Sequence, residues 1–340
     1  MWEVARACGL CGSSRHRRLF RVHRKGYVQC ADCATARLYD RVAAERLDCM
    51  YDAFCASQPR VLEERDLAIQ LANPTFACRR RRLEERVPAG RRELFEIGCG
   101  DGNFLAYMRG RGWQVRGCEY GSRTREFVRS RHGIEVSTGD FTTLPIEAGS
   151  LETIGAYMVL EHLYEPLDWI RTVRRALRTG GFLHLQVPNF RCLDRYVAGR
   201  CWSLLSFPEH VYFYEPAGLK RRLEREGFRV VGLSTYDPWH GPGTTLSSAR
   251  SCAMRLFTGR LPWPEVAGAD TPGTDGAGGA QGPGATRKKK RTLIFDTLGQ
   301  PVATLLARAQ SLIGYGNVLD VMARATTSPE GDRDLEGADA

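Results

Sequence analysis

The segment over residues 93–105 constrains this chain most, and it reads Glu-Leu-Phe-Glu-Ile-Gly-Cys-Gly-Asp-Gly-Asn-Phe-Leu. A short apolar run that carries Glu96 is followed by three alternating glycines and then by an apolar helical pattern. The glycines are Gly98, Gly100 and Gly102. This order predicts a strand, a tight turn and a helix N-terminus, which is how α/β folds approach a nucleotide-like ligand. Taken alone, the motif is also compatible with an ordinary glycine-rich turn.

The spacing of the glycines narrows the choice of ligand. A dinucleotide fingerprint has the pattern Gly-x-Gly-x-x-Gly, which lets a helix N-terminus meet a pyrophosphate. The pattern here is Gly-x-Gly-x-Gly. The carboxylate of Glu96 would repel a pyrophosphate, whereas it suits a ligand with a positively charged amino group. We therefore expect a ligand of the second kind.

Four further apolar runs continue the alternation of strands and helices, at 114–119, 137–141, 151–163 and 178–189. The first of them ends in Glu119, which lies 21 residues after Gly98. An acid about 20 residues downstream binds ribose hydroxyls in doubly wound folds. Asp140, at the end of the next run, can accept a hydrogen bond from an adenine amino group while Phe141 packs on the ring. The pattern predicts a parallel sheet with right-handed crossovers.

These motifs together resemble those of the class I S-adenosylmethionine-dependent methyltransferases, over residues 93 to about 235. The resemblance is to the small-molecule branch, which carries Val-Leu-Glu-His-Leu, Arg-x-Leu-x-x-Gly-Gly and Pro-Glu-His segments. They stand here at 159–163, 175–181 and 208–210. The resemblance implies an α/β, Rossmann-like, seven-stranded sheet with helices on both faces. It also implies that the last strand, expected at 317–324, inserts antiparallel.

The resemblance further implies which residues hold S-adenosylmethionine. The cofactor's methionine end would be held by Glu96, Gly98, Gly100 and Gly102, its ribose by Glu119, and its adenine by Asp140 and Phe141. Tyr157 and Met158 would border the sulfonium and the substrate.

A hydroxyl acceptor calls for a general base of near-neutral pKa, which favours histidine. His210, in the Pro-Glu-His segment, is the better candidate for this base, and His162 is the second. His184 is expected to be a packed residue of the fifth strand. Tyr212, Tyr214 and Trp202 either line the substrate pocket or belong to the core.

A second signal lies near the N-terminus, where Cys8, Cys11, Cys30 and Cys33 form two Cys-x2-Cys pairs. Two such knuckles at this spacing are typical of a structural Zn²⁺ ribbon. Four thiolates leave no open coordination position, so we expect a structural zinc ion. Its binding would stabilise a module too short to form its own core.

The chain divides into parts by composition and pattern. The expected parts are a zinc ribbon at 1–40, a helical connector or cap at 41–92 with two helices over 41–88, a methyltransferase domain at 93–325 and a disordered tail at 326–340. A Gly/Pro-rich stretch with a basic end, 264–291, is expected to be a disordered insertion. Helices are expected over 165–177, 216–226 and 298–313.

The overall composition fits an enzyme of the cytoplasm. No apolar run approaches the roughly 20 residues that span a bilayer, and the first residues lack the pattern of a signal peptide. Eight of the 12 cysteines lie outside the knuckles and are scattered, as in proteins of a reducing compartment.

We expect methylation of a small molecule, at a hydroxyl oxygen, in secondary or envelope metabolism. The net charge of +10 leaves an alternative, an RNA or DNA methyltransferase that grips nucleic acid with its basic ribbon. A third reading is a non-catalytic module that binds the cofactor. The methyl acceptor and the oligomeric state are not specified by any motif.

Overall fold

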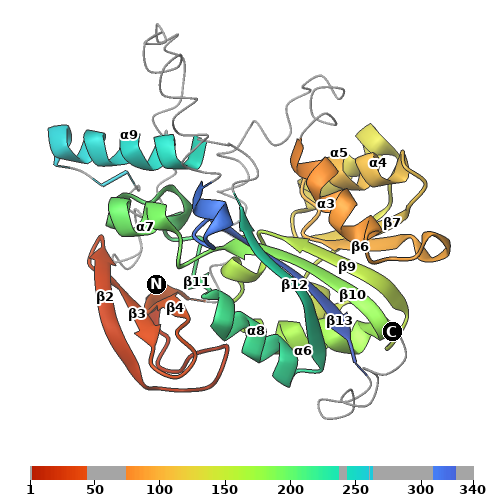
Figure 1. Cartoon of the computed structure of the whole chain (residues 1–340), viewed down its shortest axis with the longest axis horizontal. Coiled ribbons are helices and arrows are strands. Elements are labelled where there is room, and N and C mark those ends of the chain that lie inside the picture. The colour runs from red at the N-terminus through yellow and green to blue at the C-terminus, as the bar shows by residue number, and fades with distance from the viewer. Residues whose placement is uncertain (1, 44–73, 237–242, 260, 263–308, 327–340) are drawn as a thin grey trace, which may run out of the picture.

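The computed structural model describes residues 2–43, 74–236, 243–259, 261–262 and 309–326. Its centre is a seven-stranded sheet with the order β12-β13-β10-β9-β6-β7-β8 (Figure 1). The strands are β6 (Glu93–Ile97), β7 (Gln114–Glu119), β8 (Val136–Thr138), β9 (Leu151–Tyr157), β10 (Leu177–Pro188), β12 (Phe228–Tyr236) and β13 (Val318–Ala325). The pairs among β6 to β10 are parallel, and β13 runs antiparallel to both neighbours. The predicted fold class and the antiparallel last strand are confirmed.

Helices cover both faces of this sheet. One face carries α3 (Pro74–Glu84), α4 (Asn103–Arg109) and α5 (Ser122–His132), whose apolar side chains form one core cluster with Leu94 of β6. The other face carries α6 (Pro166–Ala176) and α8 (Pro216–Arg225), which pack in a second cluster with Ile97. Neighbouring residues of a strand point to opposite faces, so β6 contributes to both clusters.

The helices α6 and α8 begin and end where the sequence predicts. Each has a proline in its first turn, Pro166 and Pro216, where the missing N–H costs no hydrogen bond. In α6, Ile170 and Val173 are fully buried, as the apolar stripe predicts. The chain leaves α8 through Gly227, which has a positive φ of 84°.

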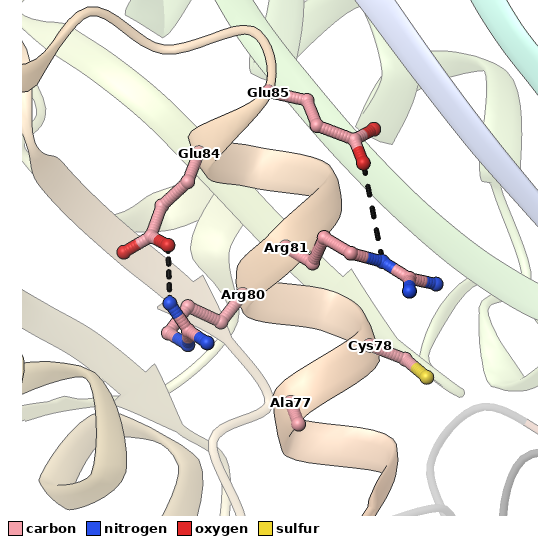
Figure 2. Close-up of a pocket in the computed structure, with 6 residues that line it drawn as sticks. All are labelled: Ala77, Cys78, Arg80, Arg81, Glu84 and Glu85. Atoms are coloured by element: carbon pink, nitrogen blue, oxygen red, sulfur yellow. Dashed lines mark hydrogen bonds and ion pairs between the residues drawn. The ribbon is translucent and has the colours of Figure 1, made fainter.

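Only part of the predicted connector can be compared with the structure, because residues 44–73 lie outside the described ranges. The described part contains α3, which begins at Pro74 and buries Leu83. The side of α3 drawn in Figure 2 carries two ion pairs of i,i+4 spacing, Arg80 with Glu84 and Arg81 with Glu85. Such pairs stabilise a helix by only a few tenths of a kcal/mol (about 0.2–0.5), so we assign no further role to this hollow.

The N-terminal module takes a strand from the rest of the chain. Its four-stranded antiparallel sheet has the order β11-β4-β3-β2. The strands are β2 (His16–Val22), β3 (Lys25–Cys30), β4 (Ala36–Leu38) and β11 (Tyr212–Phe213), and a separate pair joins β1 (Trp2–Val4) to β5 (Asp40–Val42). Since β11 follows the fifth strand of the central sheet, the module is hydrogen-bonded to the part of the chain that forms this sheet.

Side-chain packing joins the two parts as well. Leu10, Tyr27 and Leu38 of the module are buried in the same apolar cluster as Ile170 of α6. A Cβ at Gly218 of α8 would overlap the carbonyl oxygen of Cys33 in the module. The absence of a side chain at this position therefore permits the close contact.

Two more helices, α7 (Leu193–Ala198) and α9 (Gly243–Thr258), pack against each other (Figure 1). Within the described ranges, no helix is both long and apolar enough to cross a bilayer. The predicted insertion at 264–291, most of the predicted helix 298–313 and nearly all of the predicted tail lie outside them.

Candidate active site

A cavity of about 580 Å³ lies at the carboxyl ends of β6, β7 and β9. This size is typical of small-molecule sites, which span roughly 300–1,000 Å³. Six of the residues predicted from the sequence line it, namely Gly98, Glu119, Asp140, Phe141, Met158 and His162. The other predicted residues, Glu96, Gly100, Gly102, Tyr157 and His210, do not contribute to its walls. Open parallel sheets bind ligands at this edge.

The glycine turn at the cavity requires glycine for two reasons. Gly98, Gly100 and Gly102 all have positive φ, between 52° and 70°, which favours glycine. A Cβ at Gly98 would also stand 2.7 Å from a methyl group of Val159. A Cβ at Gly100 would meet nothing within 4 Å, so this position is open to a ligand.

Glu119 is held in place by backbone amides. One carboxylate oxygen accepts from Gly100 N at 2.8 Å and the other from Tyr120 N at 2.9 Å. These bonds orient the carboxylate at the end of β7, on the cavity wall. It is therefore a preorganised acceptor of the kind that binds a vicinal diol.

Asp140 and Phe141 form the neighbouring part of the wall. Asp140 accepts from Thr142 N at 2.8 Å and thereby caps a short 3-10 helix, η4 (Phe141–Thr143). Phe141 is buried against Phe95, with ring centroids 5.7 Å apart. The Asp140 carboxylate and the buried Phe141 ring are thus neighbours on the cavity wall.

Glu96 and Tyr157 face the opposite side of the sheet, because Ile97 and Met158 next to them face the cavity. Tyr157 donates to His184 Nδ1 at 3.1 Å, and His184 Nε2 donates to Asp320 at 3.0 Å. His184 is buried, as predicted, but it belongs to a polar network that sequence reasoning missed. Its partners lie on β9 and β13, so no local pattern connects them.

Glu96 is only 4% exposed, and burial raises the pKa of its carboxyl to about 8. The nearby guanidinium of Arg79 opposes this shift, and the carboxylates of Asp101 and Glu119 add to it. Oε2 of Glu96 has no hydrogen-bond partner among the described residues. A buried oxygen of this kind suits a cationic donor such as an ammonium group.

A second group of polar side chains contains both candidate bases. His162 follows β9 in the short helix η5 (Leu160–His162), and its ring centroid lies 4.6 Å from that of His210. His162 Nδ1 donates to the carbonyl of Glu209 at 3.0 Å, and His210 Nδ1 donates to that of Leu204 at 2.8 Å. His162 lies on the cavity wall, whereas His210 is 7% exposed and lies behind it.

Burial keeps both imidazoles neutral. It lowers the pKa of His162 to about 4 and that of His210 well below its usual range. In the opposite sense, burial raises the pKa of the neighbouring Glu161 carboxyl to about 8. The three side chains therefore share an environment that disfavours charge without a compensating partner.

A family model described as a methyltransferase domain matches residues 70–233. That span contains the glycine turn, Glu119, Asp140 and His162. The domain is a class I S-adenosylmethionine-dependent methyltransferase.

Similar proteins carry the same description. A probable S-adenosylmethionine-dependent methyltransferase of Mycolicibacterium smegmatis is 27% identical over 186 residues, 53% of this chain and 70% of that protein. A ubiquinone biosynthesis O-methyltransferase of Marinobacter nauticus is 25% identical over 173 residues, 46% of this chain and 72% of that protein. The crystal structure of an Archaeoglobus fulgidus SAM-dependent methyltransferase aligns with a TM-score of 0.45 and 15% identity, over 73% of this chain and 92% of that one.

The methyltransferase also brings the four predicted cysteines together. The sulfur atoms of Cys8, Cys11, Cys30 and Cys33 lie within 4.8 Å of one another, and none forms a disulfide. The sulfur atoms of Cys8 and Cys33 are 3.7 Å apart, and those of Cys11 and Cys30 are 3.5 Å apart. Four sulfurs at about 2.3 Å from one tetrahedral Zn²⁺ would lie roughly 3.8 Å apart. The four residues therefore fit the proposed zinc ion.

The first cysteine knuckle contacts the start of α6, and the residues Asp168 and Trp169 of this helix line the cavity. Gly9 N donates to the Tyr212 hydroxyl at 3.1 Å, and Gly9 O accepts from Leu167 N at 3.3 Å. The Tyr164 hydroxyl, on the cavity wall, donates to Val42 O at 2.5 Å. The N-terminal module thus supports one wall of the methyltransferase cavity.

The aromatic residues considered for the pocket belong to the core. Tyr212, Tyr214 and Trp202 are at most 2% exposed, and none of them lines this cavity. Tyr214 donates to Leu160 O at 3.0 Å, and Trp202 donates to Asn317 at 3.2 Å. They fasten the segment after β10 to the central sheet and to the N-terminal module.

Proposed function

We propose that this methyltransferase transfers a methyl group from S-adenosylmethionine to a hydroxyl oxygen of a small molecule. The proposal rests on one observation: Glu119, Asp140 and His162 all line the same cavity. Its volume of about 580 Å³ suits small ligands. The likeness to a ubiquinone biosynthesis O-methyltransferase supports a hydroxyl acceptor.

We propose a binding residue for each of three parts of the cofactor, namely the ribose, the adenine and the methionine end. When bound, S-adenosylmethionine supplies a methyl group already activated on a sulfonium. We propose that Glu119 binds the ribose hydroxyls and that Phe141 packs on the adenine. Gly100 would leave room for the methionine end, since a Cβ there meets nothing within 4 Å. We propose that the methionine end passes over this position to the other side of the sheet edge, where the orphan Oε2 of Glu96 accepts from its amino group.

The acceptor would lie against the segment that follows β9. Methyl transfer needs the acceptor oxygen aligned with the methyl group, and the hydroxyl loses its proton as the bond forms. We propose His162 as the side chain that meets the acceptor, since it lines the cavity and His210 does not. His210 then acts through its contact with His162.

Binding of the cofactor is tested first, by calorimetric titration with S-adenosylmethionine and S-adenosylhomocysteine. We expect one site per chain. Glu119→Ala should weaken binding at least tenfold, or about 1.4 kcal/mol, because the ribose loses its acceptor. Glu135→Ala, at an exposed position before β8, is the matched control and should bind like the wild type.

Turnover is tested with radiolabelled S-adenosylmethionine and two acceptor pools, hydroxyl-bearing small molecules and total RNA. The proposal predicts label in the small-molecule fraction and a loss of transfer in His162→Gln with cofactor binding retained. Label in RNA alone would contradict the proposal and favour the nucleic-acid alternative.

A further inference from the structure

We propose that Glu161, His162 and His210 bind one divalent transition-metal ion beside the cavity. The site is separate from the cysteine cluster and joins two segments of the chain, the η5 turn and the segment around 208–211. A contact of this ion with the acceptor hydroxyl rests on the proposed function, whereas the binding of the ion does not.

The first support is convergence of ligand atoms. A carboxylate oxygen of Glu161 and one ring nitrogen of each histidine lie within 4.8 Å of one another. The two segments are already adjacent, since Val211 N donates to Glu161 O at 2.9 Å. The backbone thus holds the three side chains together without a contribution from the ion.

The second support is the state of the Glu161 carboxylate. Its side chain is fully buried, and neither oxygen has a hydrogen-bond partner among the described residues. Burial of a carboxylate without a donor is strongly unfavourable, because the charge loses its hydration and gains no partner. A cation or a proton has to compensate this charge, and no basic side chain of the described ranges donates to it.

The third support is the orientation of the two imidazoles. A carbonyl oxygen only accepts, so Nδ1 of His162 and Nδ1 of His210 carry the protons in their bonds to Glu209 and Leu204. In the neutral rings the lone pair is then on Nε2. Metal-binding histidines have this arrangement, in which the second nitrogen donates to a backbone carbonyl and fixes the tautomer.

The ligand set selects the class of metal. Two imidazoles and one carboxylate suit Zn²⁺, Mn²⁺, Fe²⁺ or Co²⁺ better than Mg²⁺ or Ca²⁺, which prefer oxygen ligands alone. Three protein ligands leave coordination positions open. Because His162 reaches the cavity wall, an acceptor hydroxyl can take one of them, and a metal-bound oxygen loses its proton more readily.

The test is a titration of protein that already holds one zinc ion per chain with Co²⁺, followed by absorption. We expect one equivalent of Co²⁺ to give ligand-field bands without a sulfur-to-cobalt charge-transfer band. Such a spectrum excludes exchange into the cysteine cluster. Glu161→Gln and His210→Gln should each weaken Co²⁺ binding at least tenfold.

The matched control is Glu165→Gln, a change of the same type four residues after Glu161. Glu165 also lines the cavity, but its side chain is 63% exposed, so Co²⁺ affinity should not change. Thermal unfolding and S-adenosylmethionine titration establish that each variant is folded. Uptake of Co²⁺ with no dependence on Glu161 or His210, or no uptake, would overturn the metal site in favour of a protonated Glu161.

The two proposals fail separately. Methyl transfer to a hydroxyl without Co²⁺ uptake that depends on Glu161 and His210 would refute the metal site and leave the function intact. Binding of Co²⁺ at Glu161 with no small-molecule methylation would leave the site standing and remove the function.

Discussion

At the scale of single residues, burial decides the charge of groups that the sequence presents as ordinary. Glu96 lies between apolar neighbours on β6, and burial raises its pKa to about 8 from an ordinary value of 4.5. His162 shifts in the opposite direction, to about 4. Both side chains are therefore neutral at pH 7 in the absence of ligands, which a reading of residue types alone would not predict.

Replacing Glu96 with Gln tests this charge state. Between pH 4.5 and 8 the folded protein keeps a proton on Glu96 that the unfolded chain has released, so the free energy of unfolding falls as pH rises. Glutamine does not titrate. Relative to the wild type, Glu96→Gln should therefore gain at least ~1.4 kcal/mol between pH 5 and pH 8, the equivalent of one pKa unit.

The measurement is denaturant unfolding of both proteins at a series of pH values without cofactor. Glu93→Gln, on the same strand but partly exposed and paired with Arg116, is the control and should show a much smaller trend. A stability difference that stays constant from pH 5 to pH 8 would show that Glu96 is ionised in the folded protein.

At the scale of elements, the strand β11 connects the N-terminal module with the segment that carries His210. It pairs with β4 of the N-terminal module, and the segment before it carries His210. The first knuckle contacts Tyr212 of β11 and the start of α6. A zinc ion held by the four cysteines would therefore stabilise the cavity wall through the elements that it joins, although it would lie outside the cavity.

Cys11→Ser should loosen β11 because it removes one thiolate from the proposed zinc site. We expect hydrogen exchange of the Leu38 amide, which donates to Val211 O, to become at least tenfold faster, or about 1.4 kcal/mol. A point variant is preferable to a chelator, which would also empty the site at Glu161.

Cys78→Ser, on α3, is the control for Cys11→Ser and should leave the Leu38 amide protected. Equal protection in Cys11→Ser and the wild type would mean that the four cysteines do not stabilise this pairing.

At the scale of the whole molecule, the N-terminal module and the methyltransferase domain share one apolar cluster. They also share a sheet, through β11 and β4. A module of this size that buries its core against another domain depends on that contact for much of its stability. The positively charged N-terminal module therefore has a structural role beside the cavity. This role does not depend on whether the module also binds a further partner.

We predict a single calorimetric unfolding transition for the zinc-loaded protein, with equal calorimetric and van't Hoff enthalpies. Gly218→Ala should lower the transition temperature, since the new methyl group would overlap the carbonyl of Cys33. Helix propensity alone would give the opposite sign, about 1 kcal/mol of stabilisation. Two separate transitions, or a stabilised Gly218→Ala, would contradict the shared core.

The sequence by itself determined the alternation of strands and helices, the glycine turn, the acid at Glu119 and the four cysteines, because these depend on short spacings and on periods of 2 and 3.6 residues. Only the tertiary structure decided that His162 rather than His210 lines the cavity, that Tyr157 and Glu96 face the other side, and that β11 joins the N-terminal sheet. Each of these depends on contacts between residues far apart in the chain, such as His184 with Asp320. Such contacts follow from how the elements pack and leave no periodic signal in the sequence.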